Sequence, residues 1–156
     1  MDDYKQKGFT LIELIIAIGI FTVITSLATI NLLNAQHIAS IDSTVTTLIA
    51  DLKQQQIKAM TGDTEGRGTT SQYGVHFDAN KYVLFHGSYN AADNSNFVVN
   101  LEGTLNFTDI TGNGDIIFSQ GSGESSGLNP IILKDSLTNK QKTMTTNVYG
   151  VVASVN

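Results

Sequence analysis

The sequence contains no cysteine and only one proline, Pro130. Without cysteine, the chain has no disulfide framework, no thiolate zinc site and no cysteine nucleophile, so its stability must come from packing. Charged residues make up only 15% of the chain, and fourteen acidic against nine basic residues give a net charge of −5. This balance argues against the basic surface that proteins use to bind nucleic acid. With 156 residues, the chain has room for one folded domain.

A long apolar run is present near the N-terminus. Residues 9–33 contain a single charged side chain, Glu13, and a helix of this length extends roughly 37 Å, enough to span a bilayer. A secretory signal peptide is the alternative, but its apolar core is normally about 7 to 15 residues long. Lys5 and Lys7 precede the run and the next basic residue is Lys53. This asymmetry predicts a cytoplasmic N-terminus, with the rest of the chain across the membrane.

The helical pattern continues beyond the apolar run. Apolar residues recur at spacings of mostly three and four as far as residue 60, no proline interrupts them, and Gly62 supplies a stop signal. We therefore predict one helix over residues 9–60, whose second half is amphipathic and covers a sheet. The predicted apolar stripe consists of Ile38, Ile41, Val45, Leu48, Ile49, Leu52, Ile57 and Met60.

Beyond residue 61 the composition changes to short β-prone segments separated by glycine-rich and polar turns, which predicts an α+β fold with an antiparallel sheet. Residues 72–77 and 81–86 read as a hairpin around Asp78, Ala79 and Asn80. Further strands are predicted near residues 97–102, 104–108, 115–119, 130–134 and 143–155. The predicted loops are residues 62–71, 88–96 and 121–129.

The segment Lys7-Gly8-Phe9-Thr10-Leu11-Ile12-Glu13, followed by the apolar run, resembles the prepilin processing motif of type IV pilins and type II secretion pseudopilins. The resemblance implies that a prepilin peptidase cuts after Gly8 and methylates the new amino terminus at Phe9. An ionisable group inside a membrane span is costly and usually marks function, and the resemblance gives Glu13 a role in assembly. The implied organisation is a cleaved leader (1–8), a transmembrane and polymerisation helix (9–33), an amphipathic helix (34–61) and a β-sheet head (62–156).

The resemblance further implies a type IV pilin fold and a structural role without enzymatic activity. The expected partners are other pilins or pseudopilins, a prepilin peptidase, an inner-membrane assembly platform and its ATPase. The expected location is the inner membrane as a single-pass protein with its head outside, and then a filament. Later segments also resemble the H-type minor pseudopilins and FimT-like minor pilins (GspH/FimT family): residues 52–59, the hairpin 73–85, residues 116–118 followed by Gly121, residues 131–133 and residues 148–152.

Two loops of the predicted head carry patterns that suggest ligands. The first loop begins at Asp109 and has oxygen-bearing side chains at alternate positions and Gly114 at the sixth, as at the start of a calcium loop. Its twelfth position is Gln120, where a calcium loop has a bidentate glutamate. A turn is therefore the favoured interpretation, with calcium as the alternative and no other cofactor expected. The other loop, residues 121–127, lacks the following helix of a phosphate site and is expected to be a mobile surface loop. The calcium candidates are Asp109, Thr111, Asn113 and Asp115.

A zinc site formed by the three histidines is not expected. His37 lies on the helix, and a pairing of Phe77 with Tyr82 puts His76 and His86 on opposite faces of the hairpin.

Two rival functions remain open at this point. A DNA-uptake (competence) minor pilin would need a basic patch formed by Lys134, Lys140 and Lys142. A membrane-anchored extracytoplasmic binding or enzymatic domain would keep its anchor uncleaved. The processing motif at Gly8 and Phe9 and the presence of Glu13 argue against this second rival.

Overall fold

The computed structural model describes residues 8–127 and 129–156. The chain divides into two compact units, Met1–Gln36 and His37–Asn156, which are described separately. The described residues form one helix, α1 (Leu11–Thr61), and nine strands. The strands are β1 (Tyr73–Asp78), β2 (Lys81–His86), β3 (Phe97–Asn100), β4 (Leu105–Thr108), β5 (Asp115–Phe118), β6 (Ser125–Gly127), β7 (Ile131–Asp135), β8 (Gln141–Thr146) and β9 (Val152–Val155).

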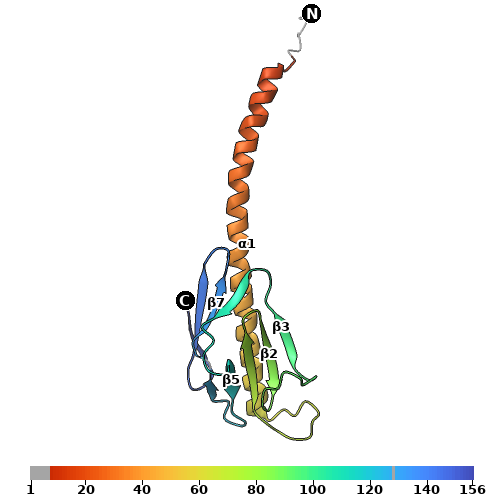
Figure 1. Cartoon of the computed structure of the whole chain (residues 1–156), viewed down its shortest axis with the longest axis vertical. Helices are drawn as coiled ribbons and strands as arrows, with labels where there is room; N and C mark the ends of the chain where they lie inside the picture. The colour runs from red at the N-terminus through yellow and green to blue at the C-terminus, as the bar shows by residue number, and fades with distance from the viewer. Residues whose placement is uncertain (1–7, 128) are drawn as a thin grey trace, which may run out of the picture. The chain divides into compact units, whose positions relative to one another are not determined.

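The strands of the second unit form two antiparallel sheets, where the sequence predicted one. The five-stranded sheet has the order β3-β2-β1-β5-β6, and the four-stranded sheet has the order β4-β7-β8-β9. Figure 1 shows β2 and β3 on one side of the second half of α1 and β7 on the other. The helix therefore packs on both sheets, and the predicted α+β arrangement of a helix on antiparallel β-structure is confirmed.

Two strand predictions were wrong. The expected single strand over residues 143–155 is divided into β8 and β9, because the chain turns between them at Gly150, whose φ of 74° is in the left-handed region. The expected loop 121–129 contains β6, which pairs with β5 from Ile116↔Gly127 to Phe118↔Ser125. The hairpin was predicted correctly, since β1 and β2 pair with Phe77 opposite Tyr82.

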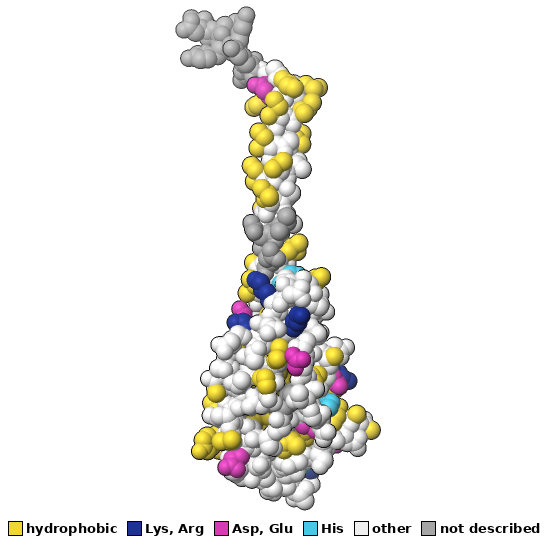
Figure 2. Space-filling model, turned by 60° about the vertical axis from the view of Figure 1, so that its left-hand side comes forward, with side chains coloured by type: hydrophobic (Ala, Val, Ile, Leu, Met, Phe, Trp, Pro, Cys, Tyr) yellow, Lys and Arg dark blue, Asp and Glu magenta, His cyan; other side chains and the backbone are white. Residues whose placement is uncertain are grey.

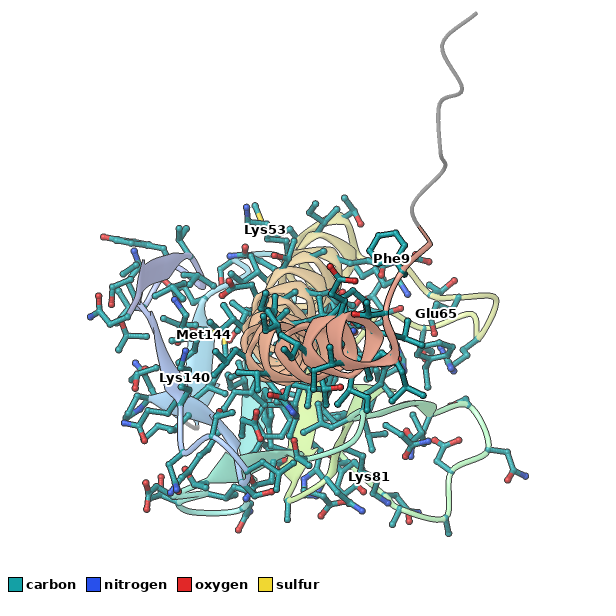
Figure 3. All side chains as sticks on the ribbon, turned by 90° about the horizontal axis from the view of Figure 1, so that it is seen from above. Phe9, Lys53, Glu65, Lys81, Lys140 and Met144 are labelled. Atoms are coloured by element: carbon teal, nitrogen blue, oxygen red, sulfur yellow. The ribbon has the colours of Figure 1, made fainter. Side chains whose placement is uncertain are left out.

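The buried face of α1 follows a regular spacing of four and three residues. Ile41, Val45, Leu48 and Leu52 are buried as predicted, and the stripe then continues through Gln55 and Ala59. This repeat keeps one seam of the helix against the sheets. On the sheet side of the same core, Met144 of β8 faces the helix (Figure 3) and is fully buried.

Three residues of the predicted stripe are instead exposed: Ile38 is 40% exposed, Ile57 58% and Met60 50%. Ile57 is two positions from both Gln55 and Ala59, so it projects from the side of the helix opposite the buried seam. Hydrophobicity alone therefore misplaced the last two turns of the stripe.

The five-stranded sheet is held together by close packing on both of its faces. On the helix side, Phe77 meets Phe107 of β4, in the other sheet, edge to face with ring centroids 5.0 Å apart. On the opposite side, the Phe85 ring lies over Gly74 of β1, where an added Cβ would be 2.4 Å from Phe85 Cζ and 2.7 Å from the Ile116 carbonyl oxygen. Only glycine therefore fits at position 74 without displacing the neighbouring strand.

Candidate functional site: the N-terminal segment of the helix

The predicted cleavage junction lies just before α1. Gly8 and Phe9 precede the helix, which begins at Leu11, and the Phe9 side chain is 92% exposed. The sequence predicted a helix start two residues earlier, at Phe9. Lys5, Lys7 and the rest of the predicted leader up to residue 7 lie outside the described residues. The junction itself is therefore an exposed, non-helical stretch of backbone, the form in which a protease can bind a chain.

Glu13 closes a capping box with Thr10 at the start of α1. The Thr10 backbone N–H and hydroxyl both donate to Glu13 Oε2 at 2.8 Å, and the Glu13 backbone N–H donates to Thr10 Oγ1 at 3.3 Å. These bonds satisfy backbone donors that the first turn of a helix leaves open. Sequence reasoning missed the part played by Thr10, although the T-x-x-E pattern before an apolar run was there to be read. The carboxylate consequently points back toward the cleavage junction.

The apolar segment of α1 is suited to a bilayer by length and composition. Leu11–Thr29 is long and apolar enough to cross a membrane, and none of it is buried in the folded chain. A signal sequence can meet the same criterion. Figure 2 shows hydrophobic side chains along the visible face of this segment, with backbone and other side chains between them. Such a surface must be covered by lipid or by other proteins to stay out of water.

The hydroxyl groups within this segment are satisfied by the helix itself. The Thr22, Thr25 and Thr29 hydroxyls donate to the carbonyl oxygens four residues earlier, and the Ser26 hydroxyl donates to the Val23 carbonyl, at 2.8 to 2.9 Å. Such back-bonding removes the cost of placing a hydroxyl in an apolar environment. Glu13 is the one ionisable side chain in Leu11–Thr29.

Three calcium candidates, Asp109, Thr111 and Asn113, lie in the turn between β4 and β5, and Asp115 is the first residue of β5. Asp109 has a φ of 54°, and Asp115 Oδ1 lies 2.6 Å from His76 Nδ1. Asp115 is therefore engaged by a histidine within the same sheet. Across residues 8–127 and 129–156, no group of three or more His, Asp or Glu side chains is placed to hold a metal ion. Calcium binding through Asp109, Thr111, Asn113 and Asp115 stays a prediction.

The three histidines lie apart in the head. His76 and His86 are opposite Val83 and Tyr73 in the hairpin register, which places them on opposite faces as predicted. His76 also stacks on Tyr89 with ring centroids 3.8 Å apart. His37 is on α1, far along the chain from both.

His37 Nδ1 lies 3.0 Å from Oδ2 of Asp135, a fully buried carboxylate on β7. A hydrogen bond from the Thr104 hydroxyl, assisted by the Leu137 N–H, the Thr138 hydroxyl and His37, lowers the pKa of Asp135 to about 2 despite its burial. The Asp135 carboxylate thus joins β7, the turn after it, the residue before β4 and the helix. Its role in this arrangement is structural.

The predicted basic patch of the DNA-uptake alternative is not formed as expected. Lys142 is opposite Leu133 in the β7–β8 register and lies 3.8 Å from Asp42 of α1, on the helix side of the sheet. Lys134 is opposite Gln141, so it projects from the other face. Two of the three lysines therefore point to different sides, and the structure does not gather them into one surface.

Comparison with known proteins identifies the N-terminal segment. Residues 3–29 match the family model of the prokaryotic N-terminal methylation motif. No curated protein and no solved structure matches the chain. The match covers Gly8, Phe9, Thr10, Glu13 and the apolar segment through Thr29. The chain therefore carries the N-terminal methylation motif of proteins processed by prepilin peptidase, which supports its place among type IV pilin-like proteins.

Proposed function

We propose that this chain is a structural subunit of a type IV pilus or of a type II secretion pseudopilus. The observation that carries the proposal is the methylation motif at residues 3–29 on an exposed apolar helix with one ionisable residue, Glu13. Its role is structural and not enzymatic. Prepilin peptidase, the inner-membrane platform and its ATPase are the proposed partners in processing and assembly.

The apolar segment favours polymerisation because, outside lipid, its surface can avoid water only by contact with other proteins. A helix extracted from the bilayer stays out of water only by packing against similar helices, as in a filament core. We propose that Leu11–Thr29 anchors the precursor in the inner membrane, with the head outside, and later forms contacts between subunits.

In such an assembly, Glu13 can set the register between neighbouring subunits. Cleavage after Gly8 creates an amino group at Phe9, which is cationic near neutral pH and lies about one helical turn from Glu13. A buried carboxylate is costly without a positive partner, so a docked neighbour can neutralise both charges in a dry core. The capping box supports this geometry, since it already directs the carboxylate toward residue 10.

The processing step is testable directly. Because the junction between Gly8 and Phe9 is exposed and matches the motif, we expect the assembled protein to begin at N-methylated Phe9. Intact-mass spectrometry of filament and membrane fractions measures this. Retention of Met1 on assembled protein, or cleavage beyond Leu33, would contradict the proposal.

The assembly step is tested by substituting Glu13. Glu13→Gln keeps a side chain that can complete the capping box but removes its charge, whereas Glu13→Ala removes both. We expect both variants to insert and fold yet to be depleted from filaments, as measured by comparing filament-associated with membrane-associated protein. Thr22→Val is the matched control, because the Thr22 hydroxyl bonds only within its own helix. Normal incorporation of both Glu13 variants would rule out a role in assembly.

The finer assignment to the H-type (GspH/FimT) branch rests on the sequence patterns of the head and stays a prediction. For the DNA-uptake alternative, the separated positions of Lys134 and Lys142 offer no support.

A further inference from the structure

A cavity of about 450 Å³ opens in the head between the last turns of α1 and the end of the hairpin. Asp51, Gln54, Gln55 and Lys58 line it from the helix, and His86 and Phe97 line it from the five-stranded sheet. All these residues belong to the second compact unit. The cavity is therefore separate in sequence from the segment proposed to drive assembly.

Two of the residues that line this cavity each have a buried polar atom without a hydrogen-bond partner. Gln55 is only 2% exposed, and its Oε1 atom is buried without a partner in the part of the chain that the structure describes. On the sheet side, His86 Nε2 is likewise buried without a partner among the described residues. Leaving a buried polar atom unpaired costs roughly 1–3 kcal/mol, and a core position so close to Leu52 would otherwise favour an apolar residue. Both residues line the cavity, so Gln55 and His86 give its wall a polar character next to the apolar core.

The charges around the cavity leave a negative centre at Asp51. Lys58 Nζ is bound to Glu65 Oε1 at 2.6 Å, and Arg67 also pairs with Glu65, which lies in the loop after the helix (Figure 3). Asp51 Oδ2 accepts a hydrogen bond from the Tyr82 hydroxyl at 2.6 Å. Among the described residues, no ion pair to Asp51 is formed. A carboxylate can accept about four hydrogen bonds, so Asp51 retains capacity for a cationic donor.

Phe97 provides an exposed aromatic surface at the rim of the cavity. It is 65% exposed on the edge strand β3, opposite Leu84 of β2. Leu84 belongs to the buried core beneath α1, so Phe97 projects from the helix-facing side of the sheet. A large aromatic ring exposed beside a carboxylate is a common platform for a planar cation.

We propose that this cavity binds an arginine side chain presented by a partner protein outside the membrane. A guanidinium group is planar and carries five N–H donors, so it can donate to the Asp51 carboxylate while stacking on Phe97, with the polar wall at Gln55 and His86 around it. The net charge of −5 favours approach of a basic partner. The chain's single arginine, Arg67, is paired with Glu65 of its own chain. Because Arg67 is already engaged, a partner of different sequence is favoured over a second copy of this chain.

The test uses the full-length chain in detergent micelles and N-acetyl-arginine amide as the probe. Its neutral isostere, N-acetyl-citrulline amide, has the same length and a planar head but no charge, and glucose represents an uncharged polyol. NMR titration follows the Gln55 side-chain amide and the Phe97 backbone amide. We expect the arginine probe alone to shift both signals saturably, with a response that weakens as salt is added.

Three variants complete the experiment. Asp51→Asn keeps an acceptor for the Tyr82 hydroxyl but loses the charge, and we expect it to weaken binding about tenfold. Phe97→Ala removes an exposed ring, and we expect a loss of about threefold. Val98→Ala, on the opposite face of the same strand and 47% exposed, should bind as the unmodified chain does.

The proposal is overturned if citrulline or glucose matches the arginine probe, or if the shifts map away from the cavity. It is equally overturned if Phe97→Ala and Val98→Ala bind alike. Should Asp51→Asn fail to fold, the comparison of arginine with citrulline and of the two β3 variants still decides the matter. Filament assembly is not measured, so failure here leaves the proposed function intact.

Discussion

The two parts of α1 both carry large apolar side chains but place them in opposite surroundings. From Leu11 to Thr29 the large apolar side chains are all more than half exposed, whereas Ile41, Val45, Leu48 and Leu52 are almost completely buried. The difference lies in arrangement. A helix that is apolar on all sides has no polar face to present to water. A helix with a narrow apolar stripe can bury that stripe against a sheet and keep its other face in water. The comparison shows that the arrangement of apolar residues around the helix distinguishes the part that its own chain covers from the part that it leaves exposed.

The largest effect that separates the two regions is expected at Leu48. Leu48 is fully buried between α1 and the sheets, so Leu48→Ala should lower the free energy of unfolding of the head by about 2–5 kcal/mol through lost burial and a residual cavity. Urea denaturation of residues 37–156 measures this. Thr47→Ala is the neighbouring control, because Thr47 is exposed and should change stability little. Equal losses at both positions would show that the helix faces are assigned wrongly.

An intermediate effect is expected from acid, because the head depends on one buried carboxylate. The pKa of Asp135 is lowered from 3.8 to about 2 by its hydrogen bonds, with the Thr104 hydroxyl as the main cause. A lowered pKa contributes stability above pH 4, and that contribution is lost as the pH falls from about 4 toward 2. We therefore expect the free energy of unfolding of the head to fall in this window.

Asp135→Asn should remove part of this acid dependence, as measured by urea denaturation at a series of pH values. Asp42→Asn is its control, since Asp42 has an exposed side chain and only a 3.8 Å contact with Lys142. An acid dependence that is the same in the unmodified head and in Asp135→Asn would assign the effect to other carboxylates.

The smallest effect is expected when the Leu48 substitution is repeated in the first region. Leu27 is 61% exposed and makes no contribution to the buried core, which lies between Ile41 and Met144. Leu27→Ala in the full chain in detergent should therefore change the unfolding of the head by less than about 0.5 kcal/mol. Hydrogen exchange of head amides provides the readout, and a loss comparable to that of Leu48→Ala would contradict the separation of the two regions.

The sequence predicted those parts of the fold that depend on strong local patterns. The long helix, the hairpin with Phe77 opposite Tyr82, and the strands around residues 97, 105, 116 and 131 all follow from periodicity and turn chemistry. The end of the buried stripe could not be found this way, because Gln55 and Ala59 are buried while Ile57 is exposed. Tertiary packing decides which face is covered, and hydrophobicity alone does not report it.

The pairing of strands that are not joined by a tight turn could not be predicted from the sequence either. β6 consists of Ser125, Ser126 and Gly127, which have little intrinsic β propensity and form a strand only because β5 lies beside them. For the candidate site, Gly8, Phe9 and Glu13 could be located from the motif, whereas the cavity around Gln55 depends on residues that are distant in sequence. The bonding of Thr10 to Glu13 was readable in principle from spacing alone.

The hydroxyl groups of the apolar segment, which donate to carbonyl oxygens of their own helix, have a thermodynamic consequence. Because Thr22, Thr25, Ser26 and Thr29 bond to their own backbone, moving Leu11–Thr29 from hydrocarbon to a packed protein interior requires no hydrogen bond to be exchanged. The hydroxyl groups therefore add no cost to such a transfer, and packing between helices is left as the driving term. Glu13 is the one ionisable side chain in Leu11–Thr29, so in the proposed assembly its carboxylate is the group whose free energy is expected to differ most between the two surroundings.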